Sequence, residues 1–313
     1  MGFSTRVSGT AEKGTNIMST TTASAIKTPR RPGALLAFCR AQPLGAAGLI
    51  VILVMGLAAI FAGAIAPYEP EVIDFGGMLM PPSFEHPFGT DAFGRDILTR
   101  IIYGARTALT IGFLSSFIGC TLGGLLGIAS AYFGGRADLI IQRFVDVMLS
   151  FPIIILALVV VAVLGKTEVL GIDLNLVLAI AIPIIPRSSR VVRSAALSVR
   201  AMPYIDAARA GGYSAWHIIT RHMAPNVLAP YLILLTAYIA QAILLEASLS
   251  FLGLGVSEPK PAWGLMLAGD SSNFYQEAPW MILFPGLAIS LSVFAFNLFG
   301  DSLRDWLDPK FRL

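Results

Sequence analysis

The sequence has few of the groups with which soluble enzymes and nucleic-acid-binding proteins work. Only 13% of its 313 residues are charged, and it contains two cysteines and three histidines. Cys39 and Cys120 lie far apart in the chain and provide neither a metal-ligand spacing nor a disulfide framework. The net charge of +3 supplies no basic surface for nucleic acid. We expect a chain that binds no metal, no cofactor and no nucleic acid.

Catalytic and nucleotide-binding motifs are also missing. The sequence has no Gly-x-Ser-x-Gly elbow and no His-Glu-x-x-His pair. Gly165, Lys166 and Thr167 resemble the end of a phosphate-binding loop, but Val160 stands where that loop needs its first glycine. A membrane enzyme would need a nucleophile or a metal constellation that the sequence does not offer. We therefore predict no catalytic residues.

Long apolar segments are what the chain has in abundance. Its residues are 56% apolar, and the mean hydropathy is +0.75. A spanning helix needs roughly 20 mostly apolar residues, because each residue rises about 1.5 Å through a hydrocarbon core of about 30 Å. We predict an all-α, multi-pass membrane protein with six transmembrane helices, at residues 44–66, 107–135, 147–165, 169–195, 223–254 and 278–300.

The fourth of these spans depends on its arginines. Its uncharged part ends at Pro186, and Arg187, Arg190 and Arg193 follow within the predicted helix. The segment is long enough to cross only if these side chains snorkel into the cytoplasmic headgroups.

The distribution of basic residues orients the chain in the bilayer. With six spans and a cytoplasmic N-terminus, 17 of the 22 Lys and Arg residues fall on the inner side, as the positive-inside rule requires. Both termini are then cytoplasmic.

Residues 1–33 are predicted to be a disordered cytoplasmic tail, with Met18 as an alternative start, and residues 34–313 to be the transmembrane domain. The first apolar run is too long for a signal peptide, so we interpret it as an uncleaved span.

A few polar or small residues interrupt the apolar segments. Glu246 must pair, hydrogen-bond or face water, which makes it a candidate for lining a passage or gate, with a structural hydrogen bond as the competing interpretation. Asn297 is a weaker candidate of the same kind. Gly119, Gly123 and Gly127 let another helix approach closely, either within this chain or in a partner.

Residues 206–226 form a polar island between two apolar segments. Pro203 can begin one short helix, and Gly211-Gly212 ends it. Ser214 is a suitable N-cap for a second helix, in which Trp216, Ile219 and Met223 share one face and which Pro225 ends. We predict an L-shaped cytoplasmic loop over residues 196–222 that docks into a partner, whereas the competing interpretation is a plain solvated connection.

The island carries a family resemblance. Asp206-Ala-Ala, Gly212 and Pro225 resemble the coupling-loop motif of bacterial ABC-importer permeases, although that motif more often has Glu in place of Asp206 and a larger apolar residue in place of Gly211. Further segments are similar to the dipeptide/oligopeptide/nickel group, and specifically to its C-type permease subunit: His86 to Asp96, Glu246 to Gly255, Pro261 to Gly264, Phe284 to Leu287 and Asn297 to Asp301.

This resemblance implies a type I ABC-importer permease fold in the bacterial cytoplasmic (inner) membrane. It implies a homologous B-type permease subunit, two ATP-binding subunits that hold ATP and Mg, and an extracytoplasmic solute-binding protein. By the same resemblance, the residues that contact the ATPase are Asp206, Ala207, Ala208, Gly212, Trp216, Ile219, His222, Pro225 and Asn226.

The segment from Pro67 to Arg106 is long for a simple connection. Its Gly-Thr-Asp and Gly-Arg-Asp triplets are typical of fixed turns. We predict an outer cap that contacts the binding protein near the passage entrance, formed by Gly89, Asp91, Gly94, Arg95 and Asp96.

The competing function is a self-sufficient secondary transporter or channel, for which inverted repeats and buried charges near the midplane are expected. No repeat is evident, and Glu246 is the single candidate for such a charge. The sequence does not select the solute among dipeptides, oligopeptides, nickel chelates, haem, glutathione and related compounds.

Overall fold

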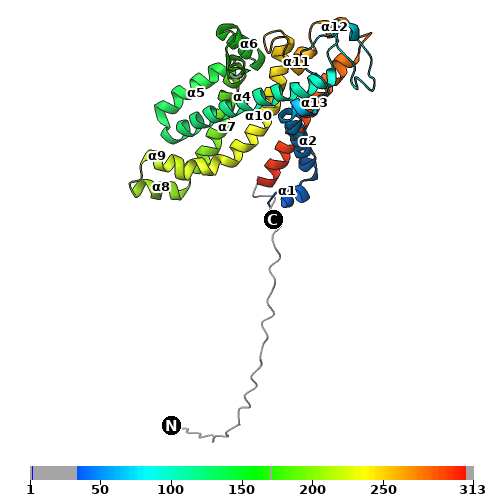
Figure 1. Cartoon of the computed structure of the whole chain (residues 1–313). Helices are drawn as coiled ribbons and strands as arrows, with labels where there is room; N and C mark the ends of the chain where they lie inside the picture. Colours follow the sequence, from blue (N-terminus) through cyan, green and yellow to red (C-terminus); the bar gives the residue numbers. More distant parts are fainter. Residues whose placement is uncertain (1, 3–33, 170, 308–313) are drawn as a thin grey trace, which may run out of the picture.

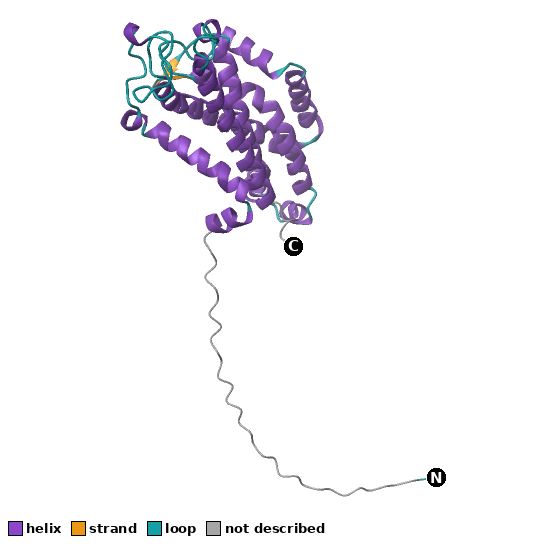
Figure 2. Ribbon diagram, turned by 90° about the vertical axis from the view of Figure 1, so that its right-hand side faces the viewer, coloured by secondary structure: helices purple, strands orange, loops and turns teal. Residues whose placement is uncertain are grey.

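The structure is a computed structural model that describes residue 2 and residues 34–169 and 171–307. The tail predicted for residues 1–33 therefore lies almost wholly outside the described residues. Long helices form one bundle, with loops and a small hairpin gathered at one end (Figures 1 and 2). The elements are α1 Ala34–Ala41, α2 Pro43–Ile60, α3 Ala62–Ile65, η1 Phe75–Gly77, α4 Ile97–Phe133, α5 Gly135–Leu149, α6 Ile153–Leu164, β1 Glu168–Val169, β2 Ile172–Asp173, α7 Leu174–Arg200, α8 Pro203–Ala210, α9 Ala215–Ile218, η2 Ile219–Met223, η3 Ala224–Val227, α10 Leu228–Phe251, α11 Trp263–Met266, α12 Asp270–Asn273 and α13 Trp280–Leu307.

Five segments of the described chain are single helices long and apolar enough to span a bilayer, and a bent pair brings the number to six. The single segments are α2, α4, α7, α13 and the continuous helical stretch Ala215–Phe251, and the bent pair is α5 with α6. The prediction of an all-helical, multi-pass membrane protein is confirmed, with the third span broken rather than straight.

The prediction of one span over residues 147–165 was wrong. Residues 147–149 are the last turn of α5, and α6 begins only at Ile153, after a bend of 93°. Pro152 causes the break, because its ring fixes φ and disfavours helical geometry in the residue before it. The preceding residues, predicted as a cytoplasmic connection, form the amphipathic helix α5 instead.

Three other boundaries differ from the prediction for local reasons. Helix α4 begins at Ile97, ahead of residue 107, because Asp96 caps it by accepting from the Thr99 amide. Helix α7 begins at Leu174 rather than residue 169, because Glu168–Val169 pairs with Ile172–Asp173 in a hairpin. It continues to Arg200, so the cytoplasmic loop starts later than residue 196.

Pro225 does not end the second short helix, which was a further error of prediction. The helical stretch runs without interruption from Ala215 to Phe251. The π turn η2 ends at Met223, and Pro225 occupies the first turn of the 3₁₀ turn η3 that follows it. A proline is tolerated there, because its missing N–H is not required in a first turn. The second half of the predicted docking loop is therefore continuous with the span that follows it.

Helices α4 and α7 form the centre of the bundle and cross at a row of glycines. A Cβ at Gly119 would lie 2.7 Å from the Ala181 carbonyl oxygen, and one at Gly127 would lie 2.5 Å from that of Ser189. Gly123 faces the backbone of α7 between these two points. The glycines therefore pack within this chain, which decides between the two interpretations that the sequence left open.

Candidate functional site

Helices α8 and α9 lie together at one end of the bundle, far from α6, α11 and α12 (Figure 1). Gly212 adopts a φ of +78°, which places it in the left-handed region. The Tyr213 amide donates to the Ala208 carbonyl at 3.2 Å, which closes the end of α8 as in a Schellman turn. Ser214 then accepts from the His217 amide at 3.3 Å and caps α9. The predicted glycine break and serine cap are both present.

Buried apolar residues hold this corner to the spans. Ile205 and Ala208 of α8 pack in one cluster with Ile218, Met223 and Val227 of the following segment. The same cluster includes residues of the two central helices, namely Ile128 and Ala131 of α4 and Val192 and Ala196 of α7. Displacement of α8 would therefore disturb its close packing with α4 and α7.

The residues implied by the resemblance divide into exposed and buried positions. The Asp206 side chain is 75% exposed, and Trp216 as a whole residue is also 75% exposed. Ala208, in contrast, is buried against the cluster. The other members are exposed at Ala207, Gly212, Pro225 and Asn226 and half-buried at Ile219 and His222. The predicted single face of Trp216, Ile219 and Met223 is wrong, because Trp216 points to the surface and Met223 is fully buried.

Aromatic and imidazole rings cluster in the α8–α9 corner. Tyr213 stacks on His217 with ring centroids 4.7 Å apart, and His222 lies about equally far from His217 and Tyr204, at 6.0 and 6.1 Å. Tyrosine, tryptophan and arginine are the residues enriched in protein interfaces. Sequence reasoning did not include Tyr204 and Tyr213 in the site, although their positions beside the motif were a usable signal.

The outer loop after α3 is fixed by turns and by two arginines. Gly89 and Gly94 both have φ of +74°, and Thr90 bridges to Asp96. The Arg95 guanidinium donates to Asp91 at 2.6 Å and to Glu258 at 2.7 Å. The predicted cap residues are thus gathered in one ordered unit. Contact between this unit and a binding protein stays a prediction.

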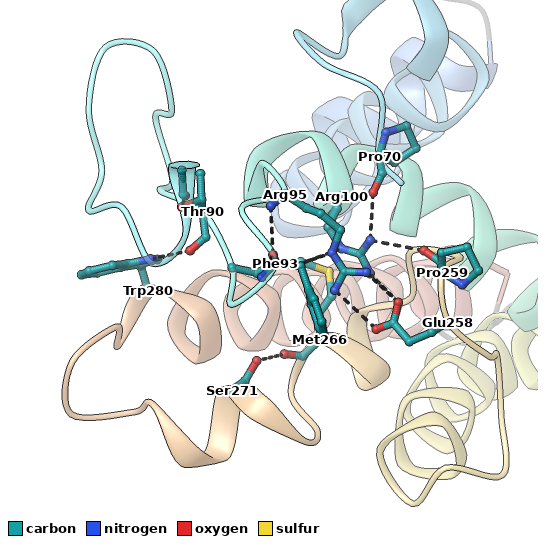
Figure 3. A network of polar contacts seen from close by, with 12 residues as sticks. Pro70, Thr90, Phe93, Arg95, Arg100, Glu258, Pro259, Met266, Ser271 and Trp280 are labelled. Atoms are coloured by element: carbon teal, nitrogen blue, oxygen red, sulfur yellow. Dashed lines mark hydrogen bonds and ion pairs between the residues drawn. The ribbon is translucent and has the colours of Figure 1, made fainter. Parts of the chain in front are cut away.

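Arg100 lies beside Arg95, and both turn toward Glu258 (Figure 3). The Arg100 side chain is 1% exposed, and its guanidinium donates to the carbonyl oxygens of Pro70 at 2.8 Å and Pro259 at 3.3 Å. Burial lowers the pKa of Arg95, but the hydrogen bond to Glu258 and the charge of Asp91 outweigh it, so its pKa lies above the ordinary value. This outer clamp of Asp91, Arg95, Arg100 and Glu258 joins two distant parts of the chain, and the Arg100 bond to Pro70 adds a third.

Replacing Glu258 with glutamine is expected to loosen this outer clamp. The substitution removes the charge that two buried guanidiniums share, and hydrogen bonds to charged groups contribute about 1.5–3 kcal/mol. Because half of the Glu258 side chain is exposed, we expect a loss of about 1–2 kcal/mol. Thermal unfolding of the purified protein measures it. Glu85→Gln, an exposed carboxylate of the same loop, is the control, and equal melting temperatures for both variants would contradict the clamp.

The two intramembrane candidates have different surroundings. Glu246 is fully buried, and its carboxylate accepts from the Ser250 hydroxyl at 2.7 Å. The same hydroxyl accepts from the Val256 amide at 3.1 Å, so Glu246 helps to hold the turn after α10. Asn297 is exposed on α13. Of the two candidates, only Asn297 is exposed, and a passage role for either residue stays a prediction.

Two ion pairs join α5 to α7, and the sequence did not reveal them. Arg193 binds Asp138 through both carboxylate oxygens, at 2.7 and 2.5 Å, and Arg190 pairs with Asp146. These arginines pair with acids of a neighbouring helix while part of each side chain remains exposed, and their reach into the headgroups stays a prediction. Asp138 and Asp146 fall between the predicted second and third spans, and nothing in the sequence indicated that they lie beside the fourth.

Comparisons with known proteins agree with this architecture. Residues 123–313 match the family described as binding-protein-dependent transport system inner membrane component, and residues 39–82 match the N-terminal TM domain of oligopeptide transport permease C. A dipeptide transport system permease protein of Alkalihalophilus pseudofirmus is 45% identical over 86% of both chains. A putative peptide transport system permease protein of Brucella abortus is 42% identical over 85% of this chain and 88% of its own length.

A third relative is a glutathione transport system permease protein of Pectobacterium atrosepticum, 41% identical over 88% of this chain and 89% of the relative. Among solved structures, a chain of the inward-facing MetNI methionine ABC transporter has a TM-score of 0.53 and 17% identity. The match covers 68% of this chain and 98% of the transporter chain. At that identity the likeness concerns the fold.

Proposed function

Because this chain belongs to the family of binding-protein-dependent transport system inner membrane components, we propose that it couples ATP hydrolysis in partner subunits to the passage of peptide-like solutes. It is a multi-pass inner-membrane permease subunit of the kind found in peptide, dipeptide and glutathione importers. Its partners in this proposal are a homologous B-type permease, two ATP-binding subunits that hold ATP and Mg, and an extracytoplasmic solute-binding protein.

The anchored and exposed corner of α8 and α9 is the observation that supports coupling. Asp206 and Trp216 project from it, while Ile205 and Ile218 are fully buried behind them. A merely solvated loop would need neither the buried anchors nor the closed glycine turn. A partner that moves this corner therefore moves the spans rather than a flexible connection.

The continuous helix from Ala215 to Phe251 supports transmission across the membrane. Its 37 residues correspond to about 55 Å at about 1.5 Å per residue, which exceeds the hydrocarbon thickness. At its outer end the chain reaches Glu258, which pairs with Arg95 and Arg100. The proposed docking corner and the outer clamp are thus joined through one helix and a short loop.

Reconstituted uptake tests the proposal. Proteoliposomes that contain this chain with its B-type permease and ATP-binding partners, supplied with the binding protein, are expected to accumulate L-alanyl-L-alanine only when ATP is present on the ATPase side. Omission of the ATP-binding subunits is expected to abolish uptake. Uptake of the dipeptide by this chain alone, driven by a proton or sodium gradient, would instead support the secondary-transporter alternative.

A further inference from the structure

A cavity of about 700 Å³ opens at the outer end of the bundle. Its walls come from the first turns of α4, from the hairpin between α6 and α7, and from the loop at residues 255–261 that follows α10. Its volume lies in the range of sites for small molecules, which is about 300–1,000 Å³. The cavity is distinct from the α8–α9 corner and includes Glu258 as the only member of the outer clamp among its lining residues.

One wall of the cavity is firmly held. The Thr107 hydroxyl donates to the Pro261 carbonyl oxygen at 3.0 Å, and the Arg100 guanidinium donates to that of Pro259 at 3.3 Å. Glu258, from the same loop, is bound by Arg95. This wall is therefore preformed and does not have to be ordered by a ligand.

Among the described residues, the hydrogen bonds and ion pairs that join the opposite wall to it are exposed lysine contacts. Lys260 of the loop pairs with Glu168 of the hairpin, and Lys166 donates to the Ser257 hydroxyl. The Lys260 and Glu168 side chains are 41% and 57% exposed, so their pair contributes little to stability. Exposed contacts of this kind can be exchanged for contacts with a ligand.

The lining charges are balanced in sign. Three are basic and three acidic: Arg106, Lys166, Lys260, Glu168, Asp173 and Glu258. Arg106 is bound to the carbonyl oxygens at the end of α2, and Asp173 caps α7. The remaining charges make the exposed contacts between the two walls, which a ligand could replace. They are Lys166, Lys260 and Glu168.

We propose that this cavity is a low-affinity outer site for a small zwitterionic solute, with its carboxylate at Lys260 and Lys166 and its ammonium group at Glu168. A zwitterion replaces both members of the Lys260–Glu168 pair at once. An anion alone would take Lys260 and leave the Glu168 carboxylate without a counter-charge. The inference rests on the proposed function, because it assigns a solute site to a permease.

Protection of an engineered thiol tests the site directly. Ser257→Cys places a thiol at the rim, and its modification by a membrane-impermeant methanethiosulfonate reagent is followed in the complete complex in nanodiscs, without binding protein or ATP. L-alanyl-L-alanine at ten times its dissociation constant is expected to slow modification about tenfold by mass action. N-acetyl-alanyl-alanine amide, which lacks both charges, is expected to give no protection.

Control variants separate binding from general effects on reactivity. Tyr275→Cys, an exposed position of the outer segment before α13, is expected to react at the same rate with and without dipeptide. Adding Glu168→Gln or Lys260→Met to Ser257→Cys is expected to abolish protection while reactivity persists. The native cysteines are buried at Cys120 and half-buried at Cys39, so the unsubstituted chain supplies the background rate.

Equal protection by the charged and capped peptides would overturn the inference, and so would a Ser257→Cys thiol that is unreactive in the assembled complex. Its failure differs from failure of the proposed function. ATP-driven uptake without protection contradicts only the outer site, and protection without ATP-driven uptake contradicts only the coupling.

Discussion

Replacing Gly123 with leucine is expected to prevent this protein from folding. A Cβ at this position would overlap the Ile185 carbonyl oxygen and would lie 2.8 Å from the Cβ of Ser188 and 3.0 Å from the Ser189 amide nitrogen. These are mostly backbone atoms, which cannot move aside as the end of a flexible side chain can. Helices α4 and α7 would have to separate along their whole crossing, and we expect a cost of about 3 kcal/mol or more.

The adjacent glycine provides a matched control for this prediction. A Cβ at Gly124 would lie 3.7 Å from the Tyr231 ring, which is ordinary contact. Gly124→Ala should therefore be neutral or gain up to about 1 kcal/mol from helix propensity, whereas Gly123→Ala should destabilise. Yield of monodisperse protein in detergent and its melting temperature measure both. Equal melting temperatures for the two alanine variants would contradict close packing at this crossing.

Reversing the charge at Asp206 is expected to stop transport without unfolding the chain. The Asp206 side chain is mostly exposed, and its nearest basic partner is the Arg209 guanidinium at 3.7 Å, so Asp206→Arg should leave the melting temperature unchanged. Placing like charges together at an interface costs several kcal/mol, and about 1.4 kcal/mol is a factor of ten in affinity. We expect dipeptide uptake to fall more than about tenfold while the ATP-binding subunits keep hydrolysing ATP.

Gly212→Pro tests the same corner through its backbone. Proline requires a φ near −65°, but Gly212 has +78° and donates its amide to the Arg209 carbonyl at 3.0 Å. The closed turn would therefore be lost, and uptake should fail as in Asp206→Arg. Asp305→Arg, an equal change of charge at an exposed site of α13, is the control. Uptake at the unsubstituted rate in both corner variants would refute the coupling role.

The membrane class and the local geometry of the α8–α9 corner were predictable because their causes are local. Uncharged apolar runs identify α2 and α13 without reference to any neighbour. The glycine break and the Ser214 cap depend on residues within a few positions of each other. The motif around Asp206 is likewise contiguous, and the family match agrees with it.

The start of α4 was not predictable, because its arginines are neutralised by distant groups. Arg100 looked like a loop residue, yet its guanidinium is enclosed by Pro70, Pro259 and Glu258, which are far from it in the chain. A charge can enter a helix at such a place only when the fold supplies its partners. The pairs that join α5 to α7 escaped prediction for the same reason.

The sequence alone therefore determined that this protein spans a membrane and that its chain breaks and caps at the α8–α9 corner, since hydropathy and capping act over short stretches of chain. Tertiary structure decided which glycines meet which backbone, which arginines are buried, and where the hairpin and the loop after α10 enclose the outer cavity. Those features depend on contacts between segments distant in sequence, which the packing of α4 against α7 and α10 and of α13 against α2 and α10 brings together.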